Sequence, residues 1–225
     1  MDEQRSTMTI PVRDAQLPAD LLLPAEPVGV VLFAHGSGSS RHSPRNVAVA
    51  RKLNDRGLAT VLVDLLTPAE DEVDARTAEL RFDIGLLASR LAGIVDWLAA
   101  ERPAGDVPIG LFGASTGAAA ALVAAASRAD RVGAVVSRGG RPDLAGAALA
   151  QVRTPTLLLV GGLDEEVITI NERARAELGE IGELWVVPGA THLFEEPGAL
   201  DQVADHAGTW FTTHLARTTA APRRS

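Results

Sequence analysis

The chain has 225 residues, of which 46% are hydrophobic and 22% are charged, and its formal net charge at pH 7 is −8. This composition supplies enough apolar residues for one core, so we expect a single domain over residues 1–225. The acidic balance argues against a nucleic-acid partner, because nucleic-acid binding depends on clustered Lys and Arg. Cysteine is absent, which excludes disulfides, thiolate metal ligands and a cysteine nucleophile.

The first residues of the chain and its longest apolar run bear on where in the cell the protein is expected. The first residues are polar and lead into no apolar stretch, which argues against a secretory signal. The longest apolar run, residues 117–126, is about half the length that crosses a bilayer. We therefore expect a cytoplasmic protein with no membrane partner. The polar ends, residues 1–7 and 217–225, are expected to be flexible.

Strand and helix patterns alternate along the chain. Residues 7–23 suggest a hairpin-like pair of strands. Runs rich in Val, Leu and Ile then predict buried strands at residues 28–34, 58–63, 107–112, 132–137, 156–160 and 184–187. Helical periodicity or Ala-rich composition predicts helices at residues 47–55, 82–100, 116–127, 144–150, 168–178 and 200–215. This alternation predicts an α/β fold, in which a mostly parallel central sheet carries helices on both faces.

The strongest motif is the G-x-S-x-G pattern of Gly113, Ser115 and Gly117, which lies between a predicted strand and an Ala-rich helix. In this context it indicates a nucleophile elbow, a sharp turn that lifts the serine hydroxyl above the sheet. The glycines let neighbouring backbone pass without a β-carbon clash. The free N–H groups at the helix start would also favour developing negative charge. The alternative is a structural Gly/Ser turn, because chains rich in small residues contain this pattern by chance.

A serine nucleophile needs a base, and the base needs an acid to orient it. Asp164 follows the predicted strand 156–160, and His192 follows the strand 184–187. Active-site loops of an open α/β sheet lie at these carboxyl ends. The order Ser, Asp, His along the chain is also that of α/β-hydrolases. We therefore predict Ser115, Asp164 and His192 as the catalytic residues.

Other residues compete for the acid and base roles. Asp164 could instead be a helix N-cap or part of an acidic face with Glu165 and Glu166. Asp143 follows the preceding strand and is the main competitor for the acid, although it also looks like the N-cap of helix 144–150. His192 could be a surface-loop histidine. The remaining histidines fit the base role less well because of their positions in the chain: His35, His42, His206 and His214.

The loop His35–Ser40 follows the first buried strand and is rich in Gly and Ser. Its place in the fold predicts half of an oxyanion hole, with a backbone N–H at Ser37 or Gly38 as one donor and that of Thr116 as the other. The alternative for this loop is a flexible polar connection.

The ordered motifs at residues 35–36, 113–117, 161–164 and 189–192 resemble the α/β-hydrolase superfamily, nearest its dienelactone-hydrolase-like branch, over residues 28–215. Residues 34–41, 43–46, 137–143 and 192–198 resemble the small hydrolases that also occur fused to phosphoribosyltransferase domains. The resemblance implies a Ser-His-Asp hydrolase with no metal and no cofactor. Dienelactone hydrolases proper use a cysteine nucleophile where this chain has Ser115, which argues against dienelactone as the substrate.

The site is expected to be open and small. Only 18 residues separate the strands 132–137 and 156–160, too few for an inserted lid domain. The chain has no Tyr, 5 Phe and 3 Trp, which disfavours a large aromatic-lined pocket. We therefore expect a small-molecule acyl substrate such as a short ester, thioester or lactone.

Four arginines follow the strands that lead to this site: Arg41, Arg45, Arg138 and Arg141. Converging guanidinium groups could hold a carboxylate or phosphate, so an anionic substrate is a hypothesis. The alternative is that Arg is simply the default cation here, because the chain has 20 Arg and one Lys.

The predicted reaction is hydrolysis through an acyl-enzyme intermediate. A different acceptor would make the protein an acyltransferase. From another class, it could be a non-catalytic binding protein on a hydrolase scaffold. The sequence leaves the oligomeric state open.

Overall fold

The computed structural model describes residues 4–220 and begins with the predicted hairpin. Strands β1 (Gln4–Val12) and β2 (Ala15–Leu23) pair antiparallel, with Gln4 opposite Leu23. The ends predicted to be flexible therefore overlap regular elements: residues 4–7 lie in β1, and residues 217–220 belong to the last helix, α6 (Ala199–Ala220). The flexibility of these ends stays a prediction. The rest of both predicted tails lies outside the described residues.

All six predicted buried strands are present in one eight-stranded sheet of order β1-β2-β4-β3-β5-β6-β7-β8. They are β3 (Gly29–Ala34), β4 (Leu58–Val63), β5 (Ile109–Ala114), β6 (Val132–Arg138), β7 (Thr156–Gly161) and β8 (Gly182–Val187). Strand β2 pairs with β4 antiparallel. The six strands from β4 to β8 in this order are all parallel to one another. The predicted α/β architecture is confirmed.

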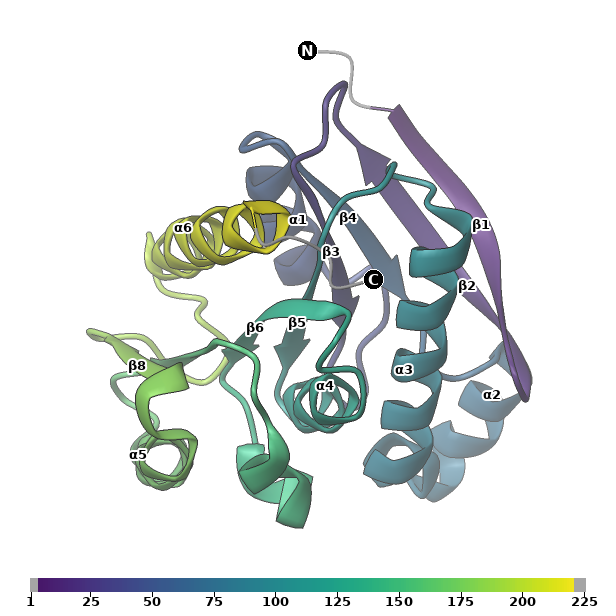
Figure 1. Cartoon of the computed structure of the whole chain (residues 1–225). Helices are drawn as coiled ribbons and strands as arrows, with labels where there is room; N and C mark the ends of the chain where they lie inside the picture. Colours follow the sequence, from purple (N-terminus) through teal and green to yellow (C-terminus); the bar gives the residue numbers. More distant parts are fainter. Residues whose placement is uncertain (1–3, 221–225) are drawn as a thin grey trace.

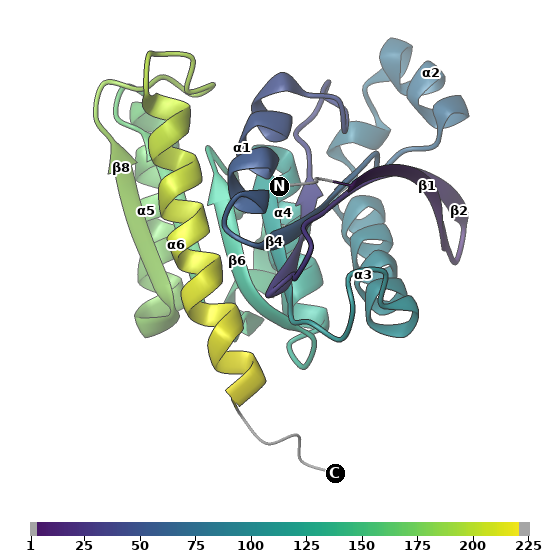
Figure 2. The same cartoon turned by 90° about the horizontal axis from the view of Figure 1, so that it is seen from above.

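Helices cover both faces of the sheet (Figure 1). Helices α1 (Pro44–Asn54) and α6 pack on one face, while α3 (Ile84–Glu101), α4 (Thr116–Ser127) and α5 (Glu165–Leu178) pack on the other. Figure 2 shows α1 and α6 in front of the sheet. Strands β3, β4, β5 and β7 are buried along their whole length, as expected for parallel strands covered on both sides.

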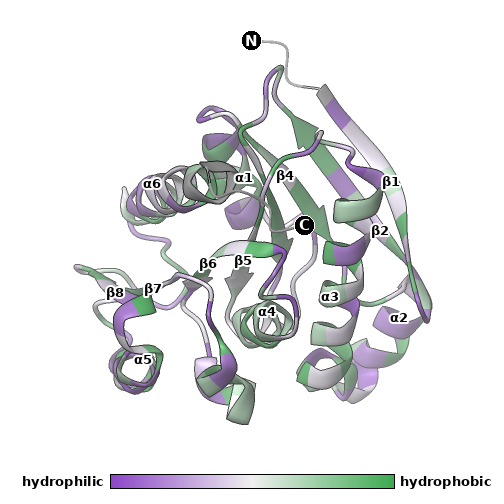
Figure 3. Cartoon of the chain, viewed as in Figure 1, coloured by the Kyte–Doolittle hydropathy of each residue, from purple (hydrophilic) through white to green (hydrophobic). Residues whose placement is uncertain are grey.

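Helix α4 lies at the centre of its layer because its side chains are small. Nine of its residues are buried, and most of these are alanines. Small side chains let the helix approach the sheet and α3 closely, which places its first turn directly above the end of β5. Figure 3 shows hydrophobic residues concentrated on the central strands.

Helix α2 (Pro68–Thr77) was not predicted, because its sequence has no apolar periodicity. A capping box holds its start: the Thr67 side chain accepts from the Glu70 N–H, and the Glu70 carboxylate accepts from the Thr67 N–H at 2.8 Å.

Three short 3₁₀ helices complete the fold: η1 (Leu80–Phe82), η2 (Pro142–Gln151) and η3 (Gly179–Ile181). Helix η2 replaces the predicted helix 144–150, with a kink at Gly146, and is the only element between β6 and β7.

Candidate active site

Ser115 occupies a strained turn between β5 and α4. Its backbone has φ +51° and ψ −120°, a conformation that non-glycine residues rarely adopt. Ser115 stands at the N-cap of α4, yet its hydroxyl makes no capping hydrogen bond. A structural Gly/Ser turn would normally use the serine oxygen to cap the helix. The free hydroxyl therefore favours a chemical role.

Gly113 and Gly117 make this turn possible, because a side chain at either position would collide with backbone. A β-carbon added at Gly113 would lie 2.4 Å from the Cα of Ala118. One added at Gly117 would lie 2.3 Å from the carbonyl oxygen of Ala34. The glycines of the motif thus serve close backbone packing around the elbow.

The structure brings Asp164 to His192. Asp164 follows β7, and its Oδ2 lies 2.6 Å from Nδ1 of His192, which follows β8. Asp164 stands at the N-cap of α5, but its side chain makes no capping hydrogen bond. Asp164 thus takes the N-cap position that the alternative interpretation gave it, but its carboxylate does not cap the helix and is positioned to orient the imidazole.

Asp143, the competing acid, is engaged elsewhere. Its carboxylate accepts two hydrogen bonds from Arg141, at 2.9 and 2.6 Å, and this pairing lowers the pKa of Asp143. Asp143 is also not an N-cap, because η2 begins at Pro142 and Arg141 takes the capping position.

The segment that follows β6 connects the serine and histidine sides of the site. The Ser115 N–H donates to the carbonyl of Arg138 at 3.1 Å, and the Arg141 N–H donates to the carbonyl of Ser115 at 3.2 Å. Between them, a β-carbon added at Gly139 would lie 3.5 Å from Cε1 of His192. Ser115 and His192 therefore border the same short segment. Direct nucleophile-to-base hydrogen bonds are often long in unliganded sites and tighten when substrate binds.

The predicted oxyanion donors lie beside the nucleophile. A β-carbon at Gly36 would be 3.1 Å from Cβ of Ser115, so the loop after β3 passes next to the elbow. Thr116 is the first residue of α4, and the first N–H groups of a helix lack acceptors within it. The Ser37 N–H donates to Oγ1 of Thr116 at 2.9 Å. Since this amide is already engaged, Gly38 is the better donor candidate from the loop.

A narrow cavity, missed by the sequence analysis, adjoins the oxyanion loop. Its volume is about 20 Å³, which is room for roughly one water molecule. Apolar walls come from Leu65, Leu66 and Leu87, while Asp74 of α2 and Arg81 of η1 close another side. Arg81 donates to the buried Asp74 carboxylate at 2.6 Å, which fixes these two elements together. The capping signature of residues 67–70 is the sequence signal that could have revealed this wall.

Two of the four candidate arginines are taken up by carboxylates of the fold. Arg41 donates to Asp64 through both its backbone N–H and its guanidinium, and its Nε lies 3.5 Å from Asp20. Arg141 forms the bidentate pair with Asp143 described above, which raises the pKa of Arg141. These internal partners argue against a substrate-binding role for Arg41 and Arg141.

The other two arginines remain candidates. Arg45 is hydrogen-bonded to the exposed Glu195 at 3.2 Å. The side chain of Arg138 is buried, and its Nη1 has no hydrogen-bond partner within residues 4–220. Within the same range, no cluster of three or more His, Asp or Glu could hold a metal ion. Nor does the described part of the chain contain a helix of the length and apolarity required to cross a membrane.

Comparison with known proteins identifies the class. The profile of the α/β hydrolase fold matches residues 29–180, and the chain belongs to this family. A dienelactone hydrolase from Anabaena variabilis ATCC 29413 is 55% identical, with a TM-score of 0.92 over 95% of this chain and 99% of that one. The chain therefore falls in the dienelactone-hydrolase-like branch. Est1E from Butyrivibrio proteoclasticus, at 18% identity and a TM-score of 0.76 over 93% of this chain and 99% of that one, shares the fold.

Curated relatives are longer proteins. Two strains of Mycobacterium tuberculosis contain a protein named "Putative phosphoribosyl transferase" that is 55% identical over 214 residues. The match covers 95% of this chain but only 47% of those proteins, so the chain spans about half of their length.

Proposed function

We propose that the protein is a serine hydrolase that cleaves a small ester, thioester or lactone. The observation that carries this proposal is the Asp164–His192 contact of 2.6 Å, at the same edge of the sheet as Ser115, whose hydroxyl does not cap its helix. The 55% identity to a dienelactone hydrolase supports the same reaction class. This chain matches only 47% of the longer M. tuberculosis proteins and itself belongs to the α/β hydrolase fold family, so we propose hydrolysis rather than phosphoribosyl transfer for it.

In the proposed mechanism Oγ of Ser115 attacks the substrate carbonyl while Nε2 of His192 takes the hydroxyl proton. The Asp164 carboxylate keeps the proton on Nδ1 of His192 and stabilises the imidazolium. The N–H groups of Thr116 and Gly38 donate to the oxyanion. The intermediate then collapses, and the leaving oxygen or sulfur receives the proton from His192. Water, deprotonated by His192, attacks the acyl-enzyme, and Ser115 recovers its proton as the carboxylic acid leaves.

A fluorophosphonate probe tests the nucleophile, because it reacts only with an activated serine. We expect labelling of the folded protein at the peptide that contains Ser115, and loss of labelling in Ser115→Ala. Ser127→Ala is the matched control, since Ser127 ends the same helix and is exposed. Labelling that persists in Ser115→Ala, or that occurs at another residue, would contradict the proposal.

A further inference from the structure

Arg138 is a buried cation with an unmet hydrogen-bonding need. It ends β6, and only 8% of its surface is exposed. Its Nη1 is buried and has no acceptor within residues 4–220. A buried charge is costly unless it is paired, and arginines at such positions usually contact carboxylates. In the part of the chain that the structure describes, no carboxylate is paired with Arg138.

A second arginine, Arg45, reaches the loop beside Arg138: it bonds to Glu195, and the same loop passes next to the residue after Arg138, where a β-carbon at Gly139 would lie 3.2 Å from the carbonyl oxygen of His192. The positive charge of Arg45, in the first turn of α1, acts on Arg138, and burial together with this like charge lowers the pKa of Arg138 to about 10. The Nε of Arg45 is also buried without an acceptor in the described chain. Glu195 engages only the Nη1 end of Arg45, at 3.2 Å, and is itself exposed. Glu195 therefore leaves two buried guanidinium atoms, Nη1 of Arg138 and Nε of Arg45, without an acceptor within residues 4–220.

This arginine pair lies next to the candidate catalytic residues. The carbonyl of Arg138 accepts the Ser115 N–H at 3.1 Å. Glu195, the partner of Arg45, is three residues after His192. The net charge of −8 repels anions from the protein as a whole, so an anion bound here must be attracted by these two arginines themselves.

We infer that Arg138 and Arg45 bind a small oxyanion, a carboxylate or phosphate group of the substrate, beside Ser115. The inference rests on the proposed hydrolase function and narrows its substrate to an anionic acyl compound. A planar guanidinium matches the two oxygens of a carboxylate or phosphate, and the anion would separate the two like charges.

The first test compares an anionic ester with a neutral one. Mono-4-nitrophenyl succinate and 4-nitrophenyl butyrate have acyl chains of the same length and differ in a terminal carboxylate. In Arg138→Met we expect the ratio of kcat/KM for the anionic ester to that for the neutral ester to fall about 10- to 100-fold. Arg45→Met, at the half-buried start of α1, should lower the same ratio and is the second variant if Arg138→Met does not fold.

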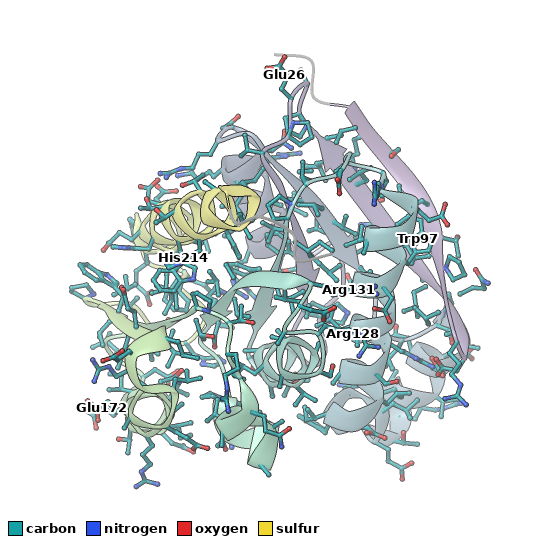
Figure 4. The ribbon with its side chains drawn as sticks, in the orientation of Figure 1. Glu26, Trp97, Arg128, Arg131, Glu172 and His214 are labelled. Atoms are coloured by element: carbon teal, nitrogen blue, oxygen red, sulfur yellow. The ribbon has the colours of Figure 1, made fainter. Side chains whose placement is uncertain are left out.

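Arg131→Met is the matched control. Arg131 immediately precedes β6, at the end opposite Arg138, and it bonds to Asp96 at 2.9 Å (Figure 4). Its removal should leave the ratio unchanged. If the Arg138 and Arg45 variants lose activity equally on both esters, the arginines are structural and the inference is wrong.

A binding measurement separates this inference from the hydrolase proposal. In the Ser115→Ala background, succinate and inorganic phosphate are titrated by calorimetry and by thermal unfolding. We expect one of them to bind and to raise the Tm, which tells a carboxylate site from a phosphate site, and we expect Arg138→Met to abolish the effect. If neither binds, or if Arg138→Met binds equally well, the inference fails. Failure of the hydrolase proposal would appear differently, as no turnover of either ester by the wild type.

Discussion

The strained backbone of Ser115 is held by contacts on every side. Its φ of +51° costs about 1–2 kcal/mol for a non-glycine residue. Hydrogen bonds from the Ser115 N–H to Arg138 and from Arg141 to the Ser115 carbonyl offset this cost, and α4 begins immediately afterwards. Ala78, Arg102 and Phe194 also have positive φ, but Ala78 and Arg102 are left-handed helix C-caps, whereas Ser115, with ψ −120°, lies outside the left-handed helical region. Strain of this kind at the predicted nucleophile indicates that the orientation of the hydroxyl matters.

Gly117→Ala tests how tightly the elbow is packed. The added β-carbon would meet the carbonyl oxygens of Ala34 and His35 at 2.3 and 2.4 Å, so we expect a loss of about 3 kcal/mol in the free energy of unfolding. Gly146→Ala is the control, because nothing lies within 4 Å of its β-carbon and only the positive φ adds about 1 kcal/mol. Urea unfolding measures both. Equal losses would mean that the elbow has room to relax.

Asp164→Asn tests which carboxylate orients His192. An amide cannot stabilise the imidazolium, so we expect kcat for ester hydrolysis to fall about 10³- to 10⁴-fold. Asp143→Asn, which only weakens the pair with Arg141, should change kcat less than about threefold. The reverse ranking in steady-state kinetics would assign the acid role to Asp143.

For single residues, the order of the motifs along the sequence predicted the candidate catalytic residues, whereas side-chain partners distant in the sequence could not be predicted. Asp164 and His192 were found from their places after successive strands, since parallel strands bring their carboxyl ends to one edge. The partners of Arg41 could not be predicted, because Asp20 belongs to β2 and Asp64 follows β4, and the pairing of these two strands is known only from the fold. The Ser37–Thr116 hydrogen bond depends in the same way on loop conformation.

Helix α2 depends on its connections rather than on an apolar face. Arg90 of α3 donates to both oxygens of Glu70 at 2.7 Å, and also to Asp14 in the β1–β2 turn and to the carbonyl of Leu65. These bonds tie α2, the hairpin and the loop after β4 to α3. A buried arginine with partners on three segments explains how a helix without apolar periodicity can form one wall of the site.

Glu70→Gln tests this connection through pH. The bonds from Arg90 lower the pKa of Glu70 from 4.5 to about 2. A lowered folded-state pKa stabilises the protein above pH 4.5, and the contribution is lost as the pH falls towards 2. The side chain is partly exposed, so we expect Glu70→Gln to cost about 2 kcal/mol at pH 7 and less than half of that at pH 3. Glu72→Gln, at an exposed position of α2, should cost little at either pH. A pH-independent cost for Glu70→Gln would mean that its charge is not involved.

Elements with regular patterns were predicted well, and the exceptions have physical causes. Strand β4 and helix α4 have the predicted bounds, because an apolar run and an Ala-rich run end at clear polar or turn residues. Helix η2 was predicted as α-helical, but Gly146 takes φ +54° and interrupts the backbone hydrogen bonds. Helix α2 was missed because a capping box and ion pairs, rather than hydrophobic periodicity, define it.

On the scale of the whole molecule, one sheet joins two cores. The α3–α4–α5 layer and the α1–α6 layer pack on the same central strands. If the sheet unfolds, both layers therefore lose the surface against which they pack. The alternation of strands and helices predicted these layers. The position of the hairpin beside β4 was not predictable, because it depends on which sheet edge remains free once the parallel strands have paired.

Unfolding of the two layers should therefore coincide, as expected for the single domain proposed for this chain. Trp97 on α3 and Trp210 on α6 lie on opposite faces of the sheet, and Figure 4 labels Trp97 and the α6 residue His214. We expect Trp97→Phe and a Trp185→Phe/Trp210→Phe double variant to show fluorescence transitions in urea that each superimpose on the circular dichroism of the same protein. Separate midpoints within one variant would indicate two independent folding units.

Ester hydrolysis by the wild type and by Ser115→Ala is the most direct test of the account. The substrates are 4-nitrophenyl esters from acetate to octanoate, and circular dichroism confirms that both proteins are folded. We predict turnover by the wild type, with a preference for short acyl groups because the cavity beside the oxyanion loop is narrow. Ser115→Ala should lower the rate at least about 10³-fold. Turnover that Ser115→Ala retains would contradict the assigned nucleophile. A folded wild type that hydrolyses none of these esters, nor the anionic succinate ester, would contradict the proposed hydrolase function.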